Sequence, residues 1–393
     1  MIDVVEAKKI IEENTKLLQP IKLTLLEAAG KILAEDIYTI TDIPAFPQSA
    51  MDGYAFNFEN WKQQPLIIEG EVAAGSNDMF TLSSGRTVRI FTGAPVPQGA
   101  DTVVMQEKVA LQNNKLVIED EQIQKGLNVR PKGSEIKAGD IALAKGDLLT
   151  PAAVAFLAGI GIKEVMAIPN PAISIIITGK ELREPGNTLE YGQVYESNSF
   201  SLTTALKQLH LNNIKIFRAD DELAALTGIL QEALKESDIV LLTGGISAGD
   251  YDFVLQAAEN CDVMKLFHKI KQRPGKPLYF GKKNDRLVFG LPGNPSSVLT
   301  CFYEYVLPAL ELLTGQTLSL KTQQAPLSDS FKKKAMLTHF LKGYYNGKEV
   351  IILDAQESYR MSSFAKANCF VVIKEEVMEC RAGEIMEVHL LPV

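Results

Sequence analysis

Turn-forming residues with small hydroxyl and amide side chains gather where one apolar run ends and a helical pattern begins. The stretch Gly290-Leu-Pro-Gly-Asn-Pro-Ser-Ser297 follows the apolar run 287–291. Its prolines fix φ, Gly293 can adopt a positive φ, and Ser296 or Ser297 can accept a hydrogen bond from a free helical N–H group. Free N–H groups and the helix dipole also attract anions. The stretch therefore predicts either a capped turn or an anion-binding loop.

Three further loops of similar composition, at 178–182, 243–252 and 273–277, are expected at strand ends. Ligands of an open α/β sheet bind beyond the carboxyl ends of its strands, so we expect all four loops to face one crevice. Their convergence favours the anion site over turns alone. The small and turn-forming residues expected to contact an anionic ligand are Gly244, Gly245, Ser247, Gly275, Pro292, Gly293, Asn294, Pro295 and Ser296.

Basic residues in these loops could supply a fixed positive charge. Lys276 stands between prolines in Pro-Gly-Lys-Pro, which holds it stiffly and suits it to bind phosphate or another oxyanion. Lys269, Lys271 and Arg273 lie just upstream and could also bind an anion. Each of these three could equally belong to a solvated strand edge.

Acidic residues in the same loops could hold a hard cation. Asp250 and Asp252, with Glu181 from the neighbouring loop, form a candidate Mg²⁺ site, since carboxylates are the ligands that Mg²⁺ prefers beside phosphate. Each acid could instead cap a helix, and for Asp252 that alternative is strong. No Gly-Lys-Ser/Thr follows the glycines of 243–252, so P-loop chemistry driven by ATP is disfavoured.

The elements that must position these loops alternate between strand and helix from residue 171 to about 315. Buried-strand runs at 172–177, 214–217 and 239–242 are separated by helical faces at 202–209 and 223–234. This order predicts a central α/β domain with a mostly parallel sheet. We therefore expect a multidomain α/β protein whose small C-terminal domain is β-barrel-like.

Other patterns surround this α/β region. Asp3 with Glu6 and Thr24 with Glu27 predict two opening helices, at 3–18 and 25–33, and Thr150-Pro151 begins another helix. Short β-type runs fill 62–148 and return after 317. The predicted domains are a helical domain at 1–45 plus 149–170, a β-rich insertion at 46–148, an α/β domain at 171–317 and a β domain at 318–393.

Composition excludes several classes of protein. The 393 residues carry 48 acidic and 40 basic side chains, a net charge of −8, which argues against a broad grip on nucleic acid or an anionic membrane. The four cysteines and four histidines show no zinc-site or disulfide spacing. The first residues lack a hydrophobic signal region, and no apolar run is long enough to span a bilayer. We expect a soluble cytoplasmic protein.

Five ordered motifs give the chain a resemblance to a known family. They are Ser49-Ala-Met-Asp-Gly-Tyr-Ala55, Thr92-Gly-Ala-Pro-Val-Pro97, Gly244-Gly-Ile-Ser-Ala-Gly-Asp-Tyr-Asp252, Pro274-Gly-Lys-Pro277 and Gly290-Leu-Pro-Gly-Asn-Pro295. Over nearly its whole length the chain resembles the molybdopterin molybdenumtransferases. These are molybdenum insertases related to the C-terminal part of gephyrin.

The resemblance implies a reaction in which adenylylated molybdopterin loses AMP as molybdate is placed on the dithiolene, with Mg²⁺ or another divalent cation. It implies a homodimer with composite sites, in which Asp52 and Thr92 face the partner's crevice. The molybdopterin adenylyltransferase and apo molybdoenzymes are further implied partners. By motif position, functional roles fall to Asp52, Thr92, Glu181, Asp220, Asp252, Lys269 and Lys276, with Arg273 beside them.

Three residues depart from the family pattern, and two other functions stay open. Lys180 stands where many relatives have Asp, Glu135 where Asp is frequent, and Lys342 where Arg is common, so bidentate anion binding at Lys342 would be lost. One alternative is adenylyl transfer from ATP to molybdopterin in the same crevice, which the extra domains disfavour. The other is a dimeric scaffold that binds a partner peptide, for which the sequence offers no linker or disordered arm.

Overall fold

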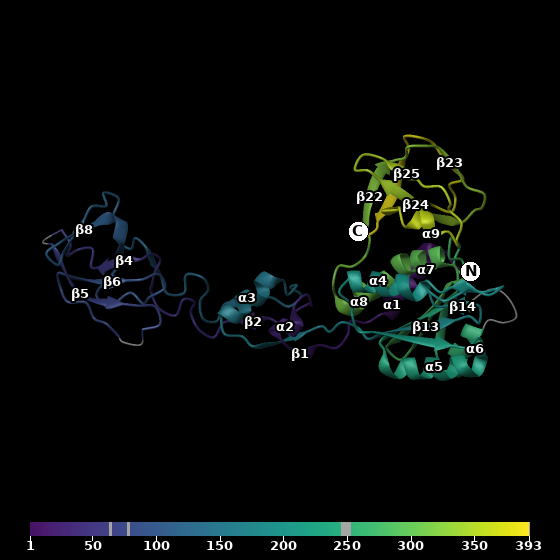
Figure 1. Ribbon diagram of the computed structural model, residues 1–393, viewed down its shortest axis with the longest axis horizontal. Coiled ribbons are helices and arrows are strands. Elements are labelled where there is room, and N and C mark those ends of the chain that lie inside the picture. Colours follow the sequence, from purple (N-terminus) through teal and green to yellow (C-terminus); the bar gives the residue numbers. More distant parts are fainter. Residues whose placement is uncertain (63–64, 77–78, 245–252, 393) are drawn as a thin grey trace. The chain divides into compact units, whose positions relative to one another are not determined.

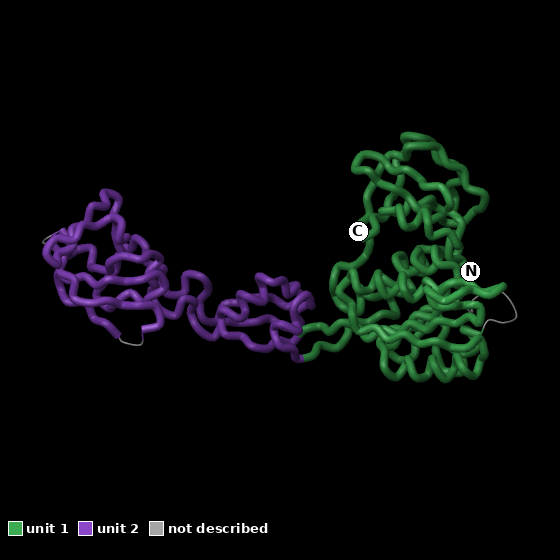
Figure 2. Tube along the Cα trace, viewed as in Figure 1, with its two compact units in different colours: residues 1–21, 167–393 green, residues 22–166 purple. Residues whose placement is uncertain are grey.

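The computed structural model describes residues 1–62, 65–76, 79–244 and 253–392. The chain forms two compact units, Met1–Ile21 with Ala167–Val393 and Lys22–Met166 (Figure 2). The first unit contains an α/β sheet and a C-terminal β sheet, and the second contains a β-rich sheet with short flanking elements. The four predicted domain boundaries stay predictions.

A six-stranded sheet forms the centre of the first unit. In spatial order its strands are β16 (Ile214–Ala219), β13 (Ile173–Thr178), β17 (Ile239–Thr243), β21 (Arg286–Leu291), β20 (Tyr279–Lys283) and β18 (Met264–His268). The first three pairings are parallel and the last two antiparallel. The prediction of an α/β sheet that is mostly parallel is confirmed.

Helices cover both faces of this sheet (Figure 1). One face packs on α5 (Leu223–Glu236) and α6 (Phe253–Asn260). The other face packs on α1 (Val4–Asn14), α4 (Asn198–Gln208), α7 (Pro295–Cys301) and α8 (Leu307–Thr314), with the π-helical turn η2 (Phe302–Val306) between α7 and α8. Successive residues of β13 are buried on opposite faces, which explains why its sequence is continuously apolar.

A second sheet closes the C-terminal part of the first unit. Its strands are β19 (Gln272–Arg273), β24 (Thr338–Tyr345), β26 (Cys369–Ile373), β28 (Ile385–Leu390) and β22 (Lys321–Pro326), with β25 (Val350–Ile352) also on β24. Short elements beside it are β23 (Phe331–Lys332), β27 (Glu379–Cys380) and α9 (Met361–Phe364). Because β19 precedes β20 of the central sheet, its pairing with β24 ties the two sheets together. A short pair, β14 (Leu182–Arg183) with β15 (Val194–Tyr195), lies outside both sheets.

The second unit is built on another six-stranded sheet. Its strands are β7 (Thr102–Met105), β4 (Gly53–Phe56), β6 (Arg86–Ile90), β5 (Leu66–Val72), β9 (Lys115–Ile118) and β8 (Val109–Gln112). Two-stranded pairs and short helices flank it: β1 (Ile21–Thr24) with β12 (Glu164–Ala167), β2 (Ile37–Tyr38) with β11 (Ile141–Leu143), β3 (Gln48–Ser49) with β10 (Val129–Arg130), η1 (Gln106–Lys108), α2 (Leu25–Ala28) and α3 (Pro151–Gly159).

The helix starts predicted from capping residues are confirmed, but both predicted opening helices are too long, since the one expected at 3–18 ends at Asn14. Asp3 accepts a hydrogen bond from the Glu6 N–H at 2.8 Å, and Thr24 and Glu27 form the reciprocal capping box. The helix expected at 25–33 is a single turn, α2. It ends because Ala29 is extended, with ψ 131°, and Gly30 adopts a φ of 75°.

Candidate active site

The carboxyl ends of the parallel strands lie at one edge of the central sheet, as the sequence predicts. Thr178 pairs with Ala219, and Thr243 pairs with Leu291, so the four strands end level with one another. The loops that begin there contain Gly244 and the stretch 290–297. Gly245, Ser247, Asp250 and Asp252 lie outside the described residues.

A crevice of about 480 Å³ opens at this edge. It brings together the loop 273–277, the start of α7 and the segment 357–359 from the C-terminal part of the unit. The residues that line the crevice are Gln272, Arg273, Pro274, Gly275, Lys276, Pro277, Pro292, Asn294, Ser297, Leu337, Glu357, Ser358 and Tyr359. Two of the four predicted loops therefore share one concave surface, and 357–359 joins them without having been predicted.

The loop that carries Lys276 is held from behind by buried groups. Gln272, fully buried, donates from Nε2 to the Gly275 carbonyl at 3.0 Å and accepts a hydrogen bond from the Tyr305 hydroxyl. A side chain at position 275 would place its Cβ 2.5 Å from Cys301 Sγ, and φ there is +84°. Only glycine fits such a position, so the loop backbone is fixed while its basic side chains stay exposed.

The basic side chains around the crevice differ in their partners. Arg273 and Lys276 are both exposed, and neither forms an ion pair with any residue that the structure describes. Lys271 instead reaches Glu375 at 3.2 Å, so the strand-edge interpretation holds for it. Lys269 lies at the same sheet edge with a φ of 78°, but it does not line the crevice. The unpaired positive charge is thus concentrated on Arg273 and Lys276.

The start of α7 is capped from outside the helix. The expectation that Ser296 or Ser297 would cap it is wrong, and Gly293 does not adopt a positive φ. The Ser296 N–H donates to the Ser358 carbonyl at 3.1 Å, and Asn294 Nδ2 donates to Ser358 Oγ at 2.9 Å. A segment distant in sequence supplies these acceptors, and no local pattern could have revealed it.

Several buried polar atoms of this unit lack a hydrogen-bond partner among the described residues. Three of them are Ser296 Oγ, Thr243 Oγ1 at the end of β17, and Asn198 Oδ1 at the start of α4. Asn198 also contacts the stretch 290–297, because its Nδ2 donates to the Gly293 carbonyl at 3.0 Å. Since buried polar atoms are normally satisfied, these atoms are suited to receive a polar ligand. Sequence reasoning missed Asn198 and Thr243, whose types are also typical of ordinary caps and strand ends.

The predicted acidic residues that the structure describes lie further along the edge, outside the crevice. Glu181 and Asp220 are exposed, and the Glu181 carboxylate folds back against Gly179, whose added Cβ would lie 2.9 Å from Oε2. Lys180 pairs with Glu222 at 3.5 Å. No group of three or more His, Cys, Asp or Glu suited to a metal ion occurs among the described residues. The proposed metal ligands Asp250 and Asp252 are not among those residues.

Asp52 and Thr92 lie together in the second unit. The Thr92 N–H and hydroxyl both donate to Asp52 Oδ1, at 2.7 and 2.8 Å. These two hydrogen bonds favour the ionised carboxylate and lower the pKa of Asp52 below its usual value. Two motifs 40 positions apart thus form one exposed anionic group.

Two of the three residues that depart from the family pattern, Lys342 and Glu135, do not line the crevice. Lys342 is buried, and its ammonium donates to the carbonyls of Ala355 at 2.7 Å, Arg360 at 3.0 Å and Glu357 at 3.4 Å. The donors of Lys342 are engaged by backbone carbonyls, and the expected loss of bidentate anion binding at this position stays a prediction. Glu135 is exposed in the second unit, where its N–H donates to the Ile43 carbonyl at 2.9 Å.

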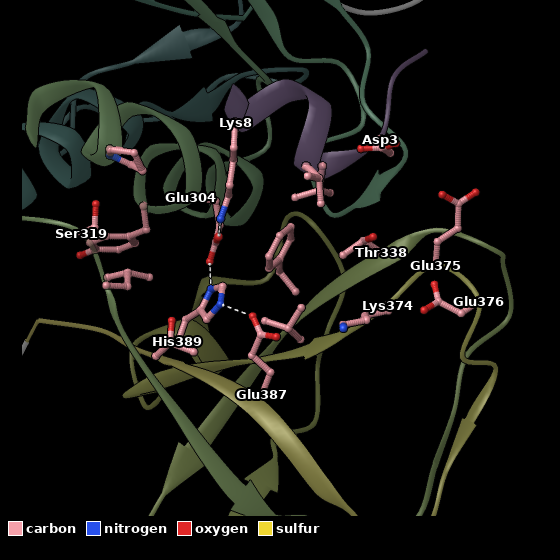
Figure 3. Close-up of a pocket in the computed structure, with 18 residues that line it drawn as sticks. Asp3, Lys8, Glu304, Ser319, Thr338, Lys374, Glu375, Glu376, Glu387 and His389 are labelled. Carbon is pink, nitrogen blue, oxygen red and sulfur yellow. Dashed lines mark hydrogen bonds and ion pairs between the residues drawn. The ribbon is translucent and has the colours of Figure 1, made fainter. Parts of the chain in front are cut away.

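The first unit holds another cavity, of about 770 Å³, in which a buried acid contacts two basic side chains (Figure 3). We call it the ion-pair cavity. Glu304 of η2 is buried, with Lys8 Nζ and His389 Nδ1 each 2.7 Å from its oxygens, and His389 Nε2 lies 2.9 Å from Glu387. Burial raises the pKa of Glu304, but His389 and Lys8 outweigh burial and the pKa is lowered overall. At His389 burial lowers the pKa, but the hydrogen bond and the charge of Glu304 outweigh burial, so the pKa of His389 is raised overall.

The chain matches three family models in order along its length. They are the MoeA N-terminal region (domain I and II) at residues 2–161, a probable molybdopterin binding domain at 174–312, and the MoeA C-terminal region (domain IV) at 324–391. Within the described residues no helix has the length and apolar character needed to cross a membrane.

Full-length relatives share this organisation. The chain is 35% identical to a molybdopterin molybdenumtransferase of Haemophilus influenzae over 98% of both chains, and 30% identical to molybdopterin molybdenumtransferase 2 of Mycobacterium tuberculosis over 99% of both. It also resembles the crystal structure of the molybdopterin biosynthesis MoeA protein of Pyrococcus horikoshii, with a TM-score of 0.83, 30% identity and 99% coverage of both chains. The chain therefore belongs to the MoeA family of molybdopterin molybdenumtransferases, enzymes of molybdenum cofactor biosynthesis.

Proposed function

We propose that the enzyme inserts molybdate into adenylylated molybdopterin with release of AMP, giving molybdenum-molybdopterin. The observation that supports this reaction best is the crevice, where exposed and unpaired Arg273 and Lys276 stand on a rigid loop. Both anionic substrates carry oxygens that such charges bind, and Arg can bind them in a bidentate manner. A fixed positive charge also stabilises negative charge that develops as AMP leaves.

The remaining residues are assigned roles by their position. Backbone close to Gly293 lets an anion approach without a side chain in the way, and Gly275 lines the crevice. Asn294 and Ser296 lie at the α7 start beside Pro292 and Pro295. Ser296 Oγ offers a buried hydroxyl free to contact substrate. Gly244, Gly245, Ser247 and Asp220 are proposed to complete the substrate site from the neighbouring strand ends, and Lys269 to add charge there.

We propose that Mg²⁺ or another divalent cation is held by Glu181, Asp250 and Asp252. The donor set is entirely carboxylate oxygen, which fits a hard cation rather than structural zinc, and Glu181 is exposed at the strand-end edge where such an ion would sit. A bound cation would neutralise charge on the phosphoanhydride. Lys180 adds a positive charge beside this site, but its contact with Glu222 draws the ammonium toward another carboxylate.

The reaction is tested by supplying adenylylated molybdopterin, molybdate and Mg²⁺ and measuring both AMP and reconstitution of an apo molybdoenzyme. We expect AMP release that depends on molybdate. A parallel assay with ATP and unmodified molybdopterin tests adenylyl transfer. Adenylylated product in that assay, without AMP release in the first, would overturn the proposal in favour of the adenylyltransferase. Inactivity in both, with a partner peptide bound, would favour the scaffold.

We further propose a homodimer whose sites combine Asp52 and Thr92 of one chain with the crevice of its partner. Asp52 and Thr92 form a preformed anionic pair in the unit that does not contain the crevice. Mixing inactive Asp52→Ala and Asp252→Ala chains should then restore about a quarter of wild-type activity, since half of the dimers would each hold one intact site. If subunit exchange is verified and the mixture stays inactive, the two residues act within one chain.

The cellular setting follows from the same reaction. We propose a cytoplasmic enzyme that receives its substrate from the molybdopterin adenylyltransferase and delivers product to apo molybdoenzymes. Four buried cysteines without disulfides, Cys261, Cys301, Cys369 and Cys380, are compatible with a reducing compartment.

A further inference from the structure

The crevice wall opposite Lys276 is formed by a turn, residues 353–360, that has little secondary structure of its own. Glu357, Ser358 and Tyr359 of this turn line the crevice, and Ser358 caps α7 through the Ser296 N–H and Asn294. The position of the turn therefore sets both the width of the crevice and the acceptors at the start of α7. Ala355 within it has a φ of 59°, a conformation that non-glycine residues seldom adopt unless surrounding contacts hold them.

Most of those contacts come from a single residue of β24, and the Ser363 hydroxyl adds a hydrogen bond to the Ala355 carbonyl at 2.8 Å. The buried Lys342 ammonium donates to the carbonyls of Ala355, Glu357 and Arg360, which uses all three of its N–H groups. The Lys342 backbone forms two hydrogen bonds with the Gln356 side chain. The Lys342 N–H donates to Gln356 Oε1 at 3.0 Å, and Gln356 Nε2 donates to the Lys342 carbonyl at 2.8 Å. Side chain and backbone of Lys342 thus hold the turn at five residues, because the Leu353 N–H also donates to the Lys342 carbonyl at 3.0 Å.

The same strand also anchors the opposite wall. Three and four positions before Lys342, His339 and Thr338 of β24 pair with Arg273 and Gln272 of β19. The loop that carries Lys276 follows directly. Strand β24 therefore contacts both walls of the crevice. It pairs with β19 on one side, and Lys342 binds the 353–360 turn on the other.

We propose that Lys342 is a positioning residue for the anionic substrates, which acts by fixing the 353–360 turn rather than by touching substrate. This inference rests on the proposed function for the identity of the ligands. Breaking the link should let the turn relax, widen the crevice and weaken substrate binding while the reacting groups stay in place.

The test compares Lys342→Met, which keeps the length of the side chain but removes its N–H donors, with wild type. We expect the KM for molybdate or for adenylylated molybdopterin to rise by about ten-fold with kcat within about two-fold, the pattern of lost binding. Amide hydrogen exchange in 353–361 should rise, while exchange in β13 and β17 stays unchanged. Gln356→Leu, which removes the two hydrogen bonds to the Lys342 backbone, should reproduce both effects in a smaller measure.

A matched control separates positioning from general loss of stability. Val388→Ala truncates a fully buried side chain in the core of the same C-terminal sheet, remote in sequence from the turn. It should lower the melting temperature of the protein without raising either KM. If Lys342→Met leaves both KM values and the exchange of the turn unchanged, or if Val388→Ala raises a KM equally, the positioning role is overturned.

The pH profile gives a readout that a purely structural lysine would not move. Burial lowers the pKa of Lys342 to about 8, with Glu357 opposing the shift and Arg360 adding to it. Above that pH the neutral amine keeps two N–H donors for three carbonyls, so the KM should rise. Lys342→Arg, which stays charged, should flatten this rise, and an identical rise in the variant would contradict the proposal. Failure of the proposed function is seen separately, as wild type without molybdate-dependent AMP release, because the exchange measurement needs no turnover.

Discussion

Two cavities of the first unit contain charged side chains but use them in opposite ways. In the ion-pair cavity, Glu304 is buried and contacts both Lys8 and His389, so its negative charge is paired within the protein. In the crevice, Arg273 and Lys276 are exposed and have no ion-pair partner among the described residues. The ion-pair cavity is larger, at about 770 Å³ against about 480 Å³. Unpaired charge on a rigid frame, rather than size, is therefore the feature for which the crevice is proposed as the binding site.

Removing the central acid of the ion-pair cavity should have the largest effect, and the effect should be on stability. Glu304→Ala leaves Lys8 and His389 without their shared partner. We expect a loss of about 3 kcal/mol in the free energy of unfolding, at the low end for breaking buried pairs because His389 can release its proton. Urea denaturation followed by circular dichroism measures this loss.

An exposed pair provides the control for this variant. Lys9 and Glu13 lie 3.7 Å apart with both side chains more than half exposed, so Lys9→Ala should cost less than about 0.5 kcal/mol. The substrate KM values of folded Glu304→Ala should match wild type. An unfolding free energy equal to wild type would show that the buried contacts contribute nothing net, and a raised KM would join the two cavities functionally.

Removing an unpaired charge of the crevice should lower substrate affinity rather than stability. Lys276→Ala should weaken binding of molybdopterin by about 1 to 3 kcal/mol, the scale of a charge-assisted hydrogen bond, without changing stability. Calorimetric titration measures the affinity. Lys271→Ala is the matched control, because Lys271 is a neighbouring lysine already paired with Glu375. Equal affinities of the two variants would remove the special role of Lys276.

A substitution at Gln272 should affect both stability and substrate affinity, since Gln272 is buried like Glu304 but supports the crevice loop. Gln272→Leu would leave the Gly275 carbonyl and the Tyr305 hydroxyl without their partner. We expect a loss of about 1 to 2 kcal/mol in stability, from unsatisfied buried groups, and a smaller loss of affinity as the loop relaxes. Denaturation and calorimetry on the same sample test this. A stability loss with wild-type affinity would show that the loop holds its shape unaided.

The difference between the cavities also explains what the sequence could predict. Local signals were sufficient for the caps at Asp3, Thr24 and Thr150 and for the strands at 172–177, 214–217 and 239–242, because periodicity and capping act between near neighbours. The prediction that Lys276 and the 290–297 stretch meet at one edge followed from the rule for parallel strands. It is confirmed by the crevice lining.

Contacts between distant segments were beyond such reasoning. Ser358 caps α7 across 62 positions of sequence, and the Glu304–His389 contact spans 85, with no pattern at either end to indicate the partner. The carbonyl contacts of Lys342 were not predicted, because a lysine in a β-type run gives no sign of whether its head group will be satisfied by backbone carbonyls. Glycine at 30 ended a helix that apolar spacing alone had extended.

The smallest expected effect is a pH dependence of stability that the ion-pair cavity should produce. The pKa of Glu304 is lowered, so its contribution is present above the usual value of 4.5 and is lost as pH falls through the folded pKa. The pKa of His389 is raised, so its contribution is complete below the usual value of 6.5 and is lost as pH rises through the folded pKa. Stability from this pair should therefore be greatest between these two values. Denaturation midpoints of wild type and His389→Phe across pH 4 to 8 test this, because the difference between them should shrink as pH rises toward 8. Lys276→Ala should parallel wild type over the whole range, and a difference between wild type and His389→Phe that is independent of pH would reduce the role of His389 to packing.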